Sequence, residues 1–477
     1  MLLPALATPC DDSLSQQVQD IHRQLLREPL RCAHANAPQI VSWSLAIPAV
    51  EPLAVLRQVN RPELRHFYWE SPARDEAIAA LGTTGLTAID APDRFARAQA
   101  WLDEVRAHCR AGGDRPLPFA GAHFLASFTF FHQATSAYPF PRATVYLPQF
   151  HIARRGQTSV LVANFDLSTP GEPTTTLSRL DRLLATIESV RQQPAVASTT
   201  TTHFLTAPDL SFHPFVPATR AALAAIQAEQ LSKIVLAQPL DVVAAGALDP
   251  IATLARLRQH YPDCTCFSLS NGRGSYFLGA SPERLASIRD RHLVVDALAG
   301  SAPRGRDAIE DARFAQQLLN SDKDRREHQA VSHYLSEQLQ SLGLRPQLAP
   351  RQLRQLSNIQ HLWTPITAQL PAQVQPLEVV AQLHPTPAVA GVPTAAACEQ
   401  IRHYENFERG LYAAPIGWLD MQGNSEFVVG IRSALLSGDR ARLYAGAGIV
   451  AGSDPDREQA EVQLKLQAML AALGLCG

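Results

Sequence analysis

The sequence predicts an α+β fold in which helices lie outside antiparallel sheets. Near the C-terminus, three consecutive strand-like runs at residues 414–420, 423–437 and 439–450 are separated by tight turns. Runs of this kind pair with their neighbours in antiparallel sheets. Helical segments lie among the other strand-like runs and would cover one face of each sheet, which favours α+β over a doubly wound α/β arrangement.

The N-terminal half carries its own strand and helix signals. Residues 123–131 and 142–165 are rich in β-branched and aromatic side chains, which predicts strands. Residues 174–193 are amphipathic at helical spacing and predict a helix. Ser, Thr and Pro dominate residues 191–217, so we interpret this stretch as a connection between two halves of the chain.

The second half mixes helices with strands. Asp249 followed by Pro250 is a helix start, because Asp caps the first turn and Pro is tolerated at its first position. A hairpin is predicted around Asn271-Gly272. The remaining segments are predicted helices at residues 218–230 and 324–342 and predicted strands at residues 233–243 and within 283–305.

Composition bounds the class of protein. The chain has 477 residues, 46% of them hydrophobic, and a formal net charge of −2. Length alone suggests about three domains. The balanced charge gives no basic field for nucleic acid, so we expect no nucleic-acid partner. No run of about 18 apolar residues occurs, so no membrane span is expected.

The cysteines and the N-terminus bear on location. Seven cysteines are scattered without a CxxC pair, which is typical of a reduced, intracellular protein. The apolar start lacks basic residues and meets Asp11 and Asp12 at once, so we expect no signal peptide. A cytoplasmic location follows by default.

A candidate site lies in a glycine-containing loop and the helix that follows it. Ser453 or Asp454 can cap this helix, and its side chains Glu458, Glu461 and Lys465 fall on one stripe. Spacing alone favours a solvated face with an i,i+4 pair between Glu461 and Lys465. The alternative is two carboxylate ligands for Mg²⁺ beside a lysine that meets an anionic substrate.

The loop before this helix and several isolated charges are weaker candidates. Gly446 and Gly448 would let a ligand approach the backbone closely. Lys233 opens an apolar strand and is either solvated or turned inward, where burial would ease its deprotonation. Glu283 follows a Ser-Pro turn and could act as an acid or base, as could Lys233.

Two further charges stand on predicted regular structure. Glu327 lies in a charge-dense helix, where a surface position is the default. Arg432 interrupts a strand that looks buried, and an unpaired buried guanidinium is costly, so we expect a carboxylate partner from the protein or from a ligand. No nucleophile elbow, P-loop, dinucleotide fingerprint or zinc signature occurs. The residues alone therefore indicate at most a Mg²⁺-dependent enzyme with a small anionic substrate.

Taken together, these pieces resemble the chorismate-utilising enzymes, and within them the isochorismate synthases that supply salicylate for siderophores. The matching stretches, in the family's order, are "SKIVLAQ", "FLGASPERL", "ALAGSAPRG", "DRREHQ", "IQHLWTPI", "LHPTPAVAG", "YAAPIGW", "GIRSA" and "YAGAGIVAGSDPDREQAEVQLK". The resemblance implies two antiparallel sheets that enclose a buried site, with outer helices. Residues 206–477 would form the catalytic region, and the loosely matching residues 1–205 a divergent part of the same structural domain.

The resemblance also implies roles for individual residues. Lys233 would be the base that activates water for attack on C2 of chorismate, and Glu283 the acid that protonates the departing C4 hydroxyl. Glu327 and Glu461 would bind Mg²⁺, with Glu458 holding a metal-bound water. Arg432, Tyr412 and Lys465 match positions that contact the substrate's carboxylates. The remaining matches are pocket-lining positions, namely Leu298, Gly300, Ser301, His361, Gly446 and Gly448.

Differences within the family favour isochorismate as the released product, feeding salicylate or siderophore synthesis. Ala299 stands where aminodeoxychorismate-forming relatives carry a nucleophilic lysine, and Lys233 stands where anthranilate synthases carry glutamine. Residues 384–393 depart from the salicylate synthase pattern. Two alternatives remain, a salicylate synthase that also eliminates pyruvate and an inactive chorismate-binding protein. A monomer without a macromolecular partner is expected, with a dimer as the alternative.

Several positions depart from the family's usual residues without removing a proposed catalytic group. They are Gln238, Ser301, Ala390, Gln459 and Val462. These departures put in question the detailed shape of the pocket more than the reaction.

Overall fold

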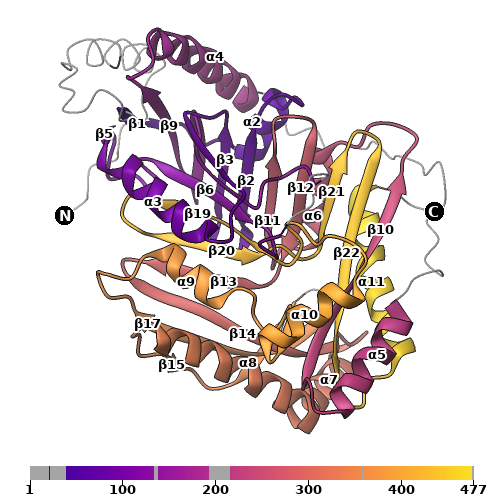
Figure 1. Ribbon diagram of the computed structural model, residues 1–477. Coiled ribbons are helices and arrows are strands. Elements are labelled where there is room, and N and C mark those ends of the chain that lie inside the picture. The colour runs from indigo at the N-terminus through magenta and orange to yellow at the C-terminus, as the bar shows by residue number, and fades with distance from the viewer. Residues whose placement is uncertain (1–20, 22–38, 134–137, 193–214, 357–358, 475–477) are drawn as a thin grey trace, which may run out of the picture.

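Two large sheets with helices on their outer faces make up the structure (Figure 1), a computed structural model. It describes residues 21, 39–133, 138–192, 215–356 and 359–474. Most of the predicted connection at 191–217, the proposed boundary at residue 205, and Cys10, Cys32 and Cys476 lie outside these ranges. Within them, no helix is long and apolar enough to span a membrane.

The first sheet has twelve strands. In spatial order they are β18 (Gly391–Val392), β10 (Lys233–Val243), β22 (Arg440–Val450), β21 (Ser433–Ser437), β12 (Ser275–Ser281), β11 (Thr265–Ser270), β2 (His66–Ser71), β3 (Glu76–Leu81), β8 (Phe150–Arg155), β9 (Thr158–Asp166), β1 (Ile40–Ile47) and β5 (Cys109–Gly113).

The second sheet has ten strands. In spatial order they are β15 (Gln347–Leu348), β17 (Ile359–Gln369), β14 (His292–Pro303), β13 (Arg284–Arg289), β20 (Ser425–Val429), β19 (Pro415–Asp420), β6 (His123–Phe128), β7 (Ala143–Leu147) and β4 (Gly85–Ile89), while β16 (Gln352–Gln355) pairs with β17.

The helices fall between these strands in the chain. They are α2 (Pro52–Val59), the 3₁₀ turn η1 (Pro72–Arg74), α3 (Arg94–Ala107), α4 (Glu172–Gln192), α5 (Phe215–Gln227), α6 (Pro250–His260), α7 (Ala308–Asn320), α8 (Asp322–Ser341), α9 (Pro376–Leu383), α10 (Thr394–Tyr404) and α11 (Pro455–Leu473).

The predicted α+β class with two antiparallel sheets is confirmed, with one exception, since β1 and β5 pair in parallel. Both sheets combine strands from the two halves of the chain. In the first sheet β2 pairs with β11, and in the second β6 pairs with β19. The N-terminal half therefore completes the sheets on which the candidate site is built.

The prediction of a single strand over residues 423–437 is wrong. The chain leaves the second sheet at the end of β20, crosses through Gly430–Arg432 and enters the first sheet as β21. A β-carbon at Gly430 would lie 2.6 Å from the carbonyl oxygen of Leu411, so the crossing requires a residue without a side chain. A second crossing, Pro282 and Glu283, joins β12 to β13.

The two crossings lie side by side. The Val429 amide donates to the Glu283 carbonyl at 3.0 Å, and the Ser281 hydroxyl donates to the Val429 carbonyl at 2.6 Å. These bonds satisfy backbone groups that neither sheet can pair. Glu283 and Arg432 are therefore brought together by the passage of the chain between sheets, not by a strand.

The predicted helix caps at Asp249 and Asp454 are confirmed. The Asp249 carboxylate accepts from the amides of the first turn of α6, and Asp454 does the same for α11. Ser453, the other candidate cap of α11, instead accepts from the Val450 amide at 3.2 Å. It closes the turn between β22 and the helix.

Candidate active site

One cavity of about 260 Å³ lies where the crossings meet β10 and β22 of the first sheet and β14 and β17 of the second. Helices α8 and α11, together with Ala388, Val389 and Tyr412, supply its remaining wall. Every residue that the sequence pointed to lines this cavity: Lys233, Glu283, Leu298, Gly300, Ser301, Glu327, His361, Tyr412, Arg432, Gly446, Gly448, Glu458, Glu461 and Lys465. The volume suits a small metabolite.

Lys233 is turned inward, which decides between the two interpretations of its position. It is the first residue of β10, is only 5% exposed, and donates from Nζ to Glu327 Oε1 at 2.7 Å. Burial acts to raise the pKa of Glu327, but the charge and hydrogen bond of Lys233 outweigh it and lower that pKa. Glu327 therefore stays ionised and faces the cavity from α8, not the solvent.

Glu283 occupies a buried position for a carboxyl group. It is 8% exposed and sits in the crossing between β12 and β13. Burial, together with the nearby charge of Asp296 and against that of Lys233, raises the pKa of Glu283 to about 7. A carboxyl group with this pKa is substantially protonated at neutral pH and can donate a proton to a leaving group.

The side chains of Glu458, Glu461 and Lys465 on α11 form part of the cavity wall, and two of them form an ion pair. Lys465 Nζ lies 2.8 Å from Glu461 Oε1, the predicted i,i+4 pair, and donates to the Gly446 carbonyl at 2.9 Å. Burial and the negative charge of Glu461 raise the pKa of Glu458, against a hydrogen bond from Ser453. Burial and Glu461 therefore disfavour the ionised form of Glu458, and the charges of Lys323 and Lys465 favour it.

The residues present fit a magnesium ion. Glu327 reaches the cavity from α8, and Glu458 and Glu461 reach it from α11. Among the residues that the structure describes, no group of three or more His, Cys, Asp or Glu side chains converges as a ready metal centre. Mg²⁺ does not need such a cage, because it takes one or two carboxylates and keeps water or substrate oxygens for the rest.

Arg432 differs from its sequence-based description. It lies in the crossing before β21, not within a strand, and has a positive φ of 48°. Its guanidinium lies over the Tyr261 ring at 5.6 Å, and Nη1 is 3.6 Å from Cys264 Sγ. The sequence left open whether its carboxylate partner comes from the protein or from a ligand, and within the described ranges Arg432 forms no ion pair with a protein carboxylate. A carboxylate on a ligand would supply the missing charge.

Ser301 and His361 form a hydrogen-bonded pair on neighbouring strands. Ser301 Oγ lies 2.8 Å from His361 Nδ1, at a bulge of β14 where Gly300 has a φ of 75°. Burial first, and then the charges of Arg432 and Lys465, lower the pKa of His361 to about 3. The ring is neutral, and within the described structure its buried Nε2 has no hydrogen-bond partner, so it is available to a ligand.

The predicted glycines provide room for other side chains. A β-carbon at Gly446 would lie 3.0 Å from the Tyr412 hydroxyl, and one at Gly448 would lie 3.3 Å from Lys233 Cε. Tyr412 itself stacks on Tyr444, with ring centroids 5.1 Å apart. Gly446 and Gly448 therefore allow Tyr412 and Lys233 to approach β22 closely, as well as leaving space for a ligand.

Sequence reasoning missed part of the lining. Lys323, Asp324, Val235, Val389 and Tyr444 also face the cavity. Lys323 precedes Glu327 by four residues on α8, so the i,i+4 spacing could have pointed to it. Its charge acts to lower the pKa values of Glu327 and Glu458. The side chains of Val235, Val389 and Tyr444 carry no sequence signal that separates them from the core.

Two of the unusual residues contact each other. Gln459 Nε2 lies 3.3 Å from Gln238 Oε1, so the two departures from the family pattern form one amide pair between α11 and β10. Val462 is fully buried in the core. None of these three residues lines the cavity.

Comparison with known proteins identifies the family. The profile described as "Chorismate binding enzyme" matches residues 25–474. The chain belongs to this family of chorismate-binding enzymes. It is 34% identical to the salicylate biosynthesis isochorismate synthase of Pseudomonas aeruginosa, over 93% of this chain and 92% of that protein.

Further relatives agree with this assignment over the whole length. The isochorismate synthase MenF of Bacillus subtilis is 29% identical over 96% of this chain and 99% of its own. The solved structure of MenF, the menaquinone-specific isochorismate synthase from Escherichia coli, superimposes with a TM-score of 0.77 at 27% identity, covering 97% of this chain and 100% of that one. The family resemblance seen in the sequence is thereby confirmed.

Proposed function

We propose that this protein is a Mg²⁺-dependent isochorismate synthase that converts chorismate to isochorismate. The observation that carries the proposal is the convergence of Lys233, Glu283 and the acidic residues of α8 and α11 on one cavity. Membership of the chorismate-binding family and the relatives named as isochorismate synthases suggest the substrate and product.

The proposed chemistry exchanges one hydroxyl for another across the ring. Lys233 Nζ, in its uncharged form, accepts a proton from a water molecule as that water attacks C2 of chorismate. This form would be favoured when Mg²⁺ holds Glu327 and weakens its ion pair with Lys233. The ring double bonds shift, and the C4 hydroxyl departs as water after taking a proton from Glu283. Because burial raises the pKa of Glu283 to about 7, this group holds a proton to donate near neutral pH.

The other cavity residues bind and orient the substrate in this proposal. Arg432, Tyr412 and Lys465 would contact its carboxylates, and the neutral His361, fixed by Ser301, offers Nε2 as a further polar contact. Glu327 and Glu461 would hold Mg²⁺, with Glu458 bound through water. When bound, the ion would offset the charge of the ring carboxylate and fix its position.

We infer that the product enters salicylate-type synthesis, since the relative with 34% identity carries that name. The MenF relatives make a quinone pathway the competing destination. The alternative enzyme, a salicylate synthase, would release pyruvate from the same substrate.

The test is incubation of the purified protein with chorismate, with Mg²⁺ or with EDTA, followed by chromatography and a coupled pyruvate assay. Isochorismate formed only with the metal, and no pyruvate, is the expected result. Stoichiometric pyruvate would favour the salicylate synthase. Tight chorismate binding without turnover would favour an inactive binding protein.

A further inference from the structure

A buried ion pair lies behind the cavity, between Glu405 and Arg409. Their side chains are 4% and 1% exposed. Arg409 binds the carboxylate through two bonds, from Nη2 to Oε1 at 2.6 Å and from Nε to Oε2 at 2.8 Å. Burial opposes the charge of Arg409, but Glu405 raises the pKa of Arg409 above its usual value. Neither residue lines the cavity.

This ion pair binds the outer edge of β10, the strand that begins with Lys233. The short strand β18 pairs only with Lys233 and Ile234. Beyond it, Arg409 Nη2 donates to the Val235 carbonyl at 2.8 Å, and Glu405 Oε1 accepts from the Ala237 amide at 2.8 Å. The two side chains therefore continue the edge of the sheet as a neighbouring strand would.

The same guanidinium reaches two other parts of the cavity wall. Arg409 Nη1 donates to the carbonyl of Val389, which lines the cavity, at 2.9 Å. The Arg409 carbonyl accepts from the amide of Tyr412 at 2.9 Å, and the guanidinium lies 5.9 Å from the centre of the Tyr412 ring. One side chain thus connects β10, the segment around Val389 and Tyr412.

Stability alone does not explain why the chain keeps two charges here. A buried ion pair costs desolvation energy, and apolar residues of similar volume are often as stable or more so. What apolar residues cannot supply is a set of directed bonds to three backbone positions. A change of about 1 Å in a reacting group can cost about a hundredfold in rate, so such directed bonds matter most beside a reactive side chain.

We propose that Glu405 and Arg409 are positioning residues, which hold β10, and with it Lys233, in register with Tyr412 and Val389 around the cavity. This inference rests on the proposed function for its effect on rate, but the bonds to Val235 and Ala237 can be tested without any turnover.

The experiment compares Arg409→Lys and the double variant Glu405→Leu/Arg409→Met with Glu426→Gln as a matched control. Lysine keeps the charge but cannot donate in all these directions, and the double variant removes both charges so that neither is left buried alone. Glu426 is also buried and ion-paired, yet lies outside the cavity lining. For each variant, kcat, the chorismate KM, the melting temperature and amide hydrogen exchange are measured.

The expected result is a fall in kcat per folded molecule of about 10- to 100-fold in both Arg409 variants, with a smaller change in KM. Exchange at the Ala237 amide should rise most in the double variant, which removes the acceptor of that amide, and Glu426→Gln should change neither kcat nor this exchange. The inference would be overturned if both Arg409 variants had the wild-type kcat, or if amide exchange at Ala237 were unchanged. If the wild type does not turn over chorismate, the proposed function fails, and the exchange result alone then decides the positioning role.

Discussion

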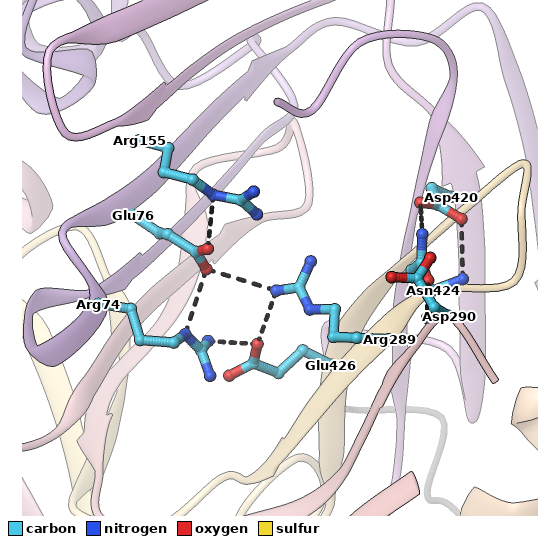
Figure 2. Close-up of polar contacts among 8 residues, drawn as sticks. All are labelled: Arg74, Glu76, Arg155, Arg289, Asp290, Asp420, Asn424 and Glu426. Carbon is cyan, nitrogen blue, oxygen red and sulfur yellow. Dashed lines mark hydrogen bonds and ion pairs between the residues drawn. The ribbon is translucent and has the colours of Figure 1, made fainter. Parts of the chain in front are cut away.

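Two clusters of ion-paired side chains differ in what they bind. Behind the cavity, Glu405 and Arg409 bond to backbone atoms of strands and segments that carry cavity residues. Elsewhere, five side chains bond to one another across the two sheets (Figure 2): Arg74, Glu76, Arg155, Arg289 and Glu426. None of these five lines the cavity.

The second cluster, which we call the inter-sheet network, connects the layers at a distance from the reactive groups. Glu76 on β3 accepts from Arg155 on β8 at 2.8 Å and contacts Arg289 on β13 at 3.3 Å. Glu426 on β20 contacts Arg74 and Arg289. Arg289 lies at the end of β13 opposite Glu283. The inter-sheet network thus joins two layers through side chains, whereas Glu405 and Arg409 fix the position of a strand through bonds to its backbone.

The largest effect on activity is expected for Lys233, the proposed base in the cavity. Lys233→Ala should reduce isochorismate formation by about a hundredfold or more, because no other group is assigned to take the proton from water. The measurement is kcat with saturating Mg²⁺ and chorismate. Full activity in this variant would remove Lys233 from the reaction.

Glu283, which also lines the cavity, is expected to make kcat depend on pH. As a proton donor with a pKa of about 7, it should make kcat fall as pH rises through about 7. Glu283→Gln should lower kcat by about a hundredfold and remove this limb of the profile. An identical alkaline limb in the variant would assign it to another group.

The same carboxyl group also links stability to pH. Its pKa is raised in the folded state, so the proton it binds stabilises the fold at low pH, and this contribution is lost as pH rises through about 7. At pH 8, Glu283→Gln should therefore unfold with a free energy about 1–3 kcal/mol higher than the wild type. Chemical denaturation at pH 5 and pH 8 measures this, and an equal difference at both pH values would argue against the linkage.

An intermediate effect on activity is expected for Glu461, a proposed Mg²⁺ ligand. Glu461→Gln removes a charged ligand, so the Mg²⁺ concentration for half-maximal activity should rise by about tenfold. Glu188→Gln is the control, because Glu188 pairs with Arg191 on the outer helix α4. An unchanged titration for Glu461→Gln would place the ion elsewhere.

The smallest effect on activity is expected in the inter-sheet network. Glu426→Gln should lower the free energy of unfolding by about 1–3 kcal/mol, since it weakens contacts to two partly exposed arginines. Activity per folded molecule should stay the same. A fall in kcat comparable to that of the Arg409 variants would erase the distinction between the two clusters.

Local signals in the sequence were sufficient for much of the fold. The extent of β10 and the caps at Asp249 and Asp454 follow from propensity and backbone chemistry, and the structure agrees. The crossing at Gly430–Arg432 could not be predicted in this way. One long strand and two shorter strands in different sheets can have the same apolar run in the sequence. The parallel pairing of β1 and β5 likewise depends on tertiary packing.

The candidate site, like the fold, could be predicted from the sequence only in part. Spacing alone left Glu461 and Lys465 as a surface ion pair, and only the family resemblance brought the scattered residues together in advance. Their roles stay predictions until they are tested. The i,i+4 spacing of Glu405 and Arg409 fits an ordinary surface ion pair, and it gave no sign of their bonds to backbone atoms far away in the chain, such as the Val235 carbonyl. Lys323 was detectable by its spacing from Glu327 but had no assigned role.

The most direct test of the account is to follow chorismate by NMR with Mg²⁺ and purified protein, in the wild type and in Lys233→Ala side by side. The expected result is that isochorismate appears in the wild type until it reaches equilibrium with chorismate, without pyruvate, and that the variant forms almost none. Absence of isochorismate in the wild type, or equal rates in the two proteins, would contradict it.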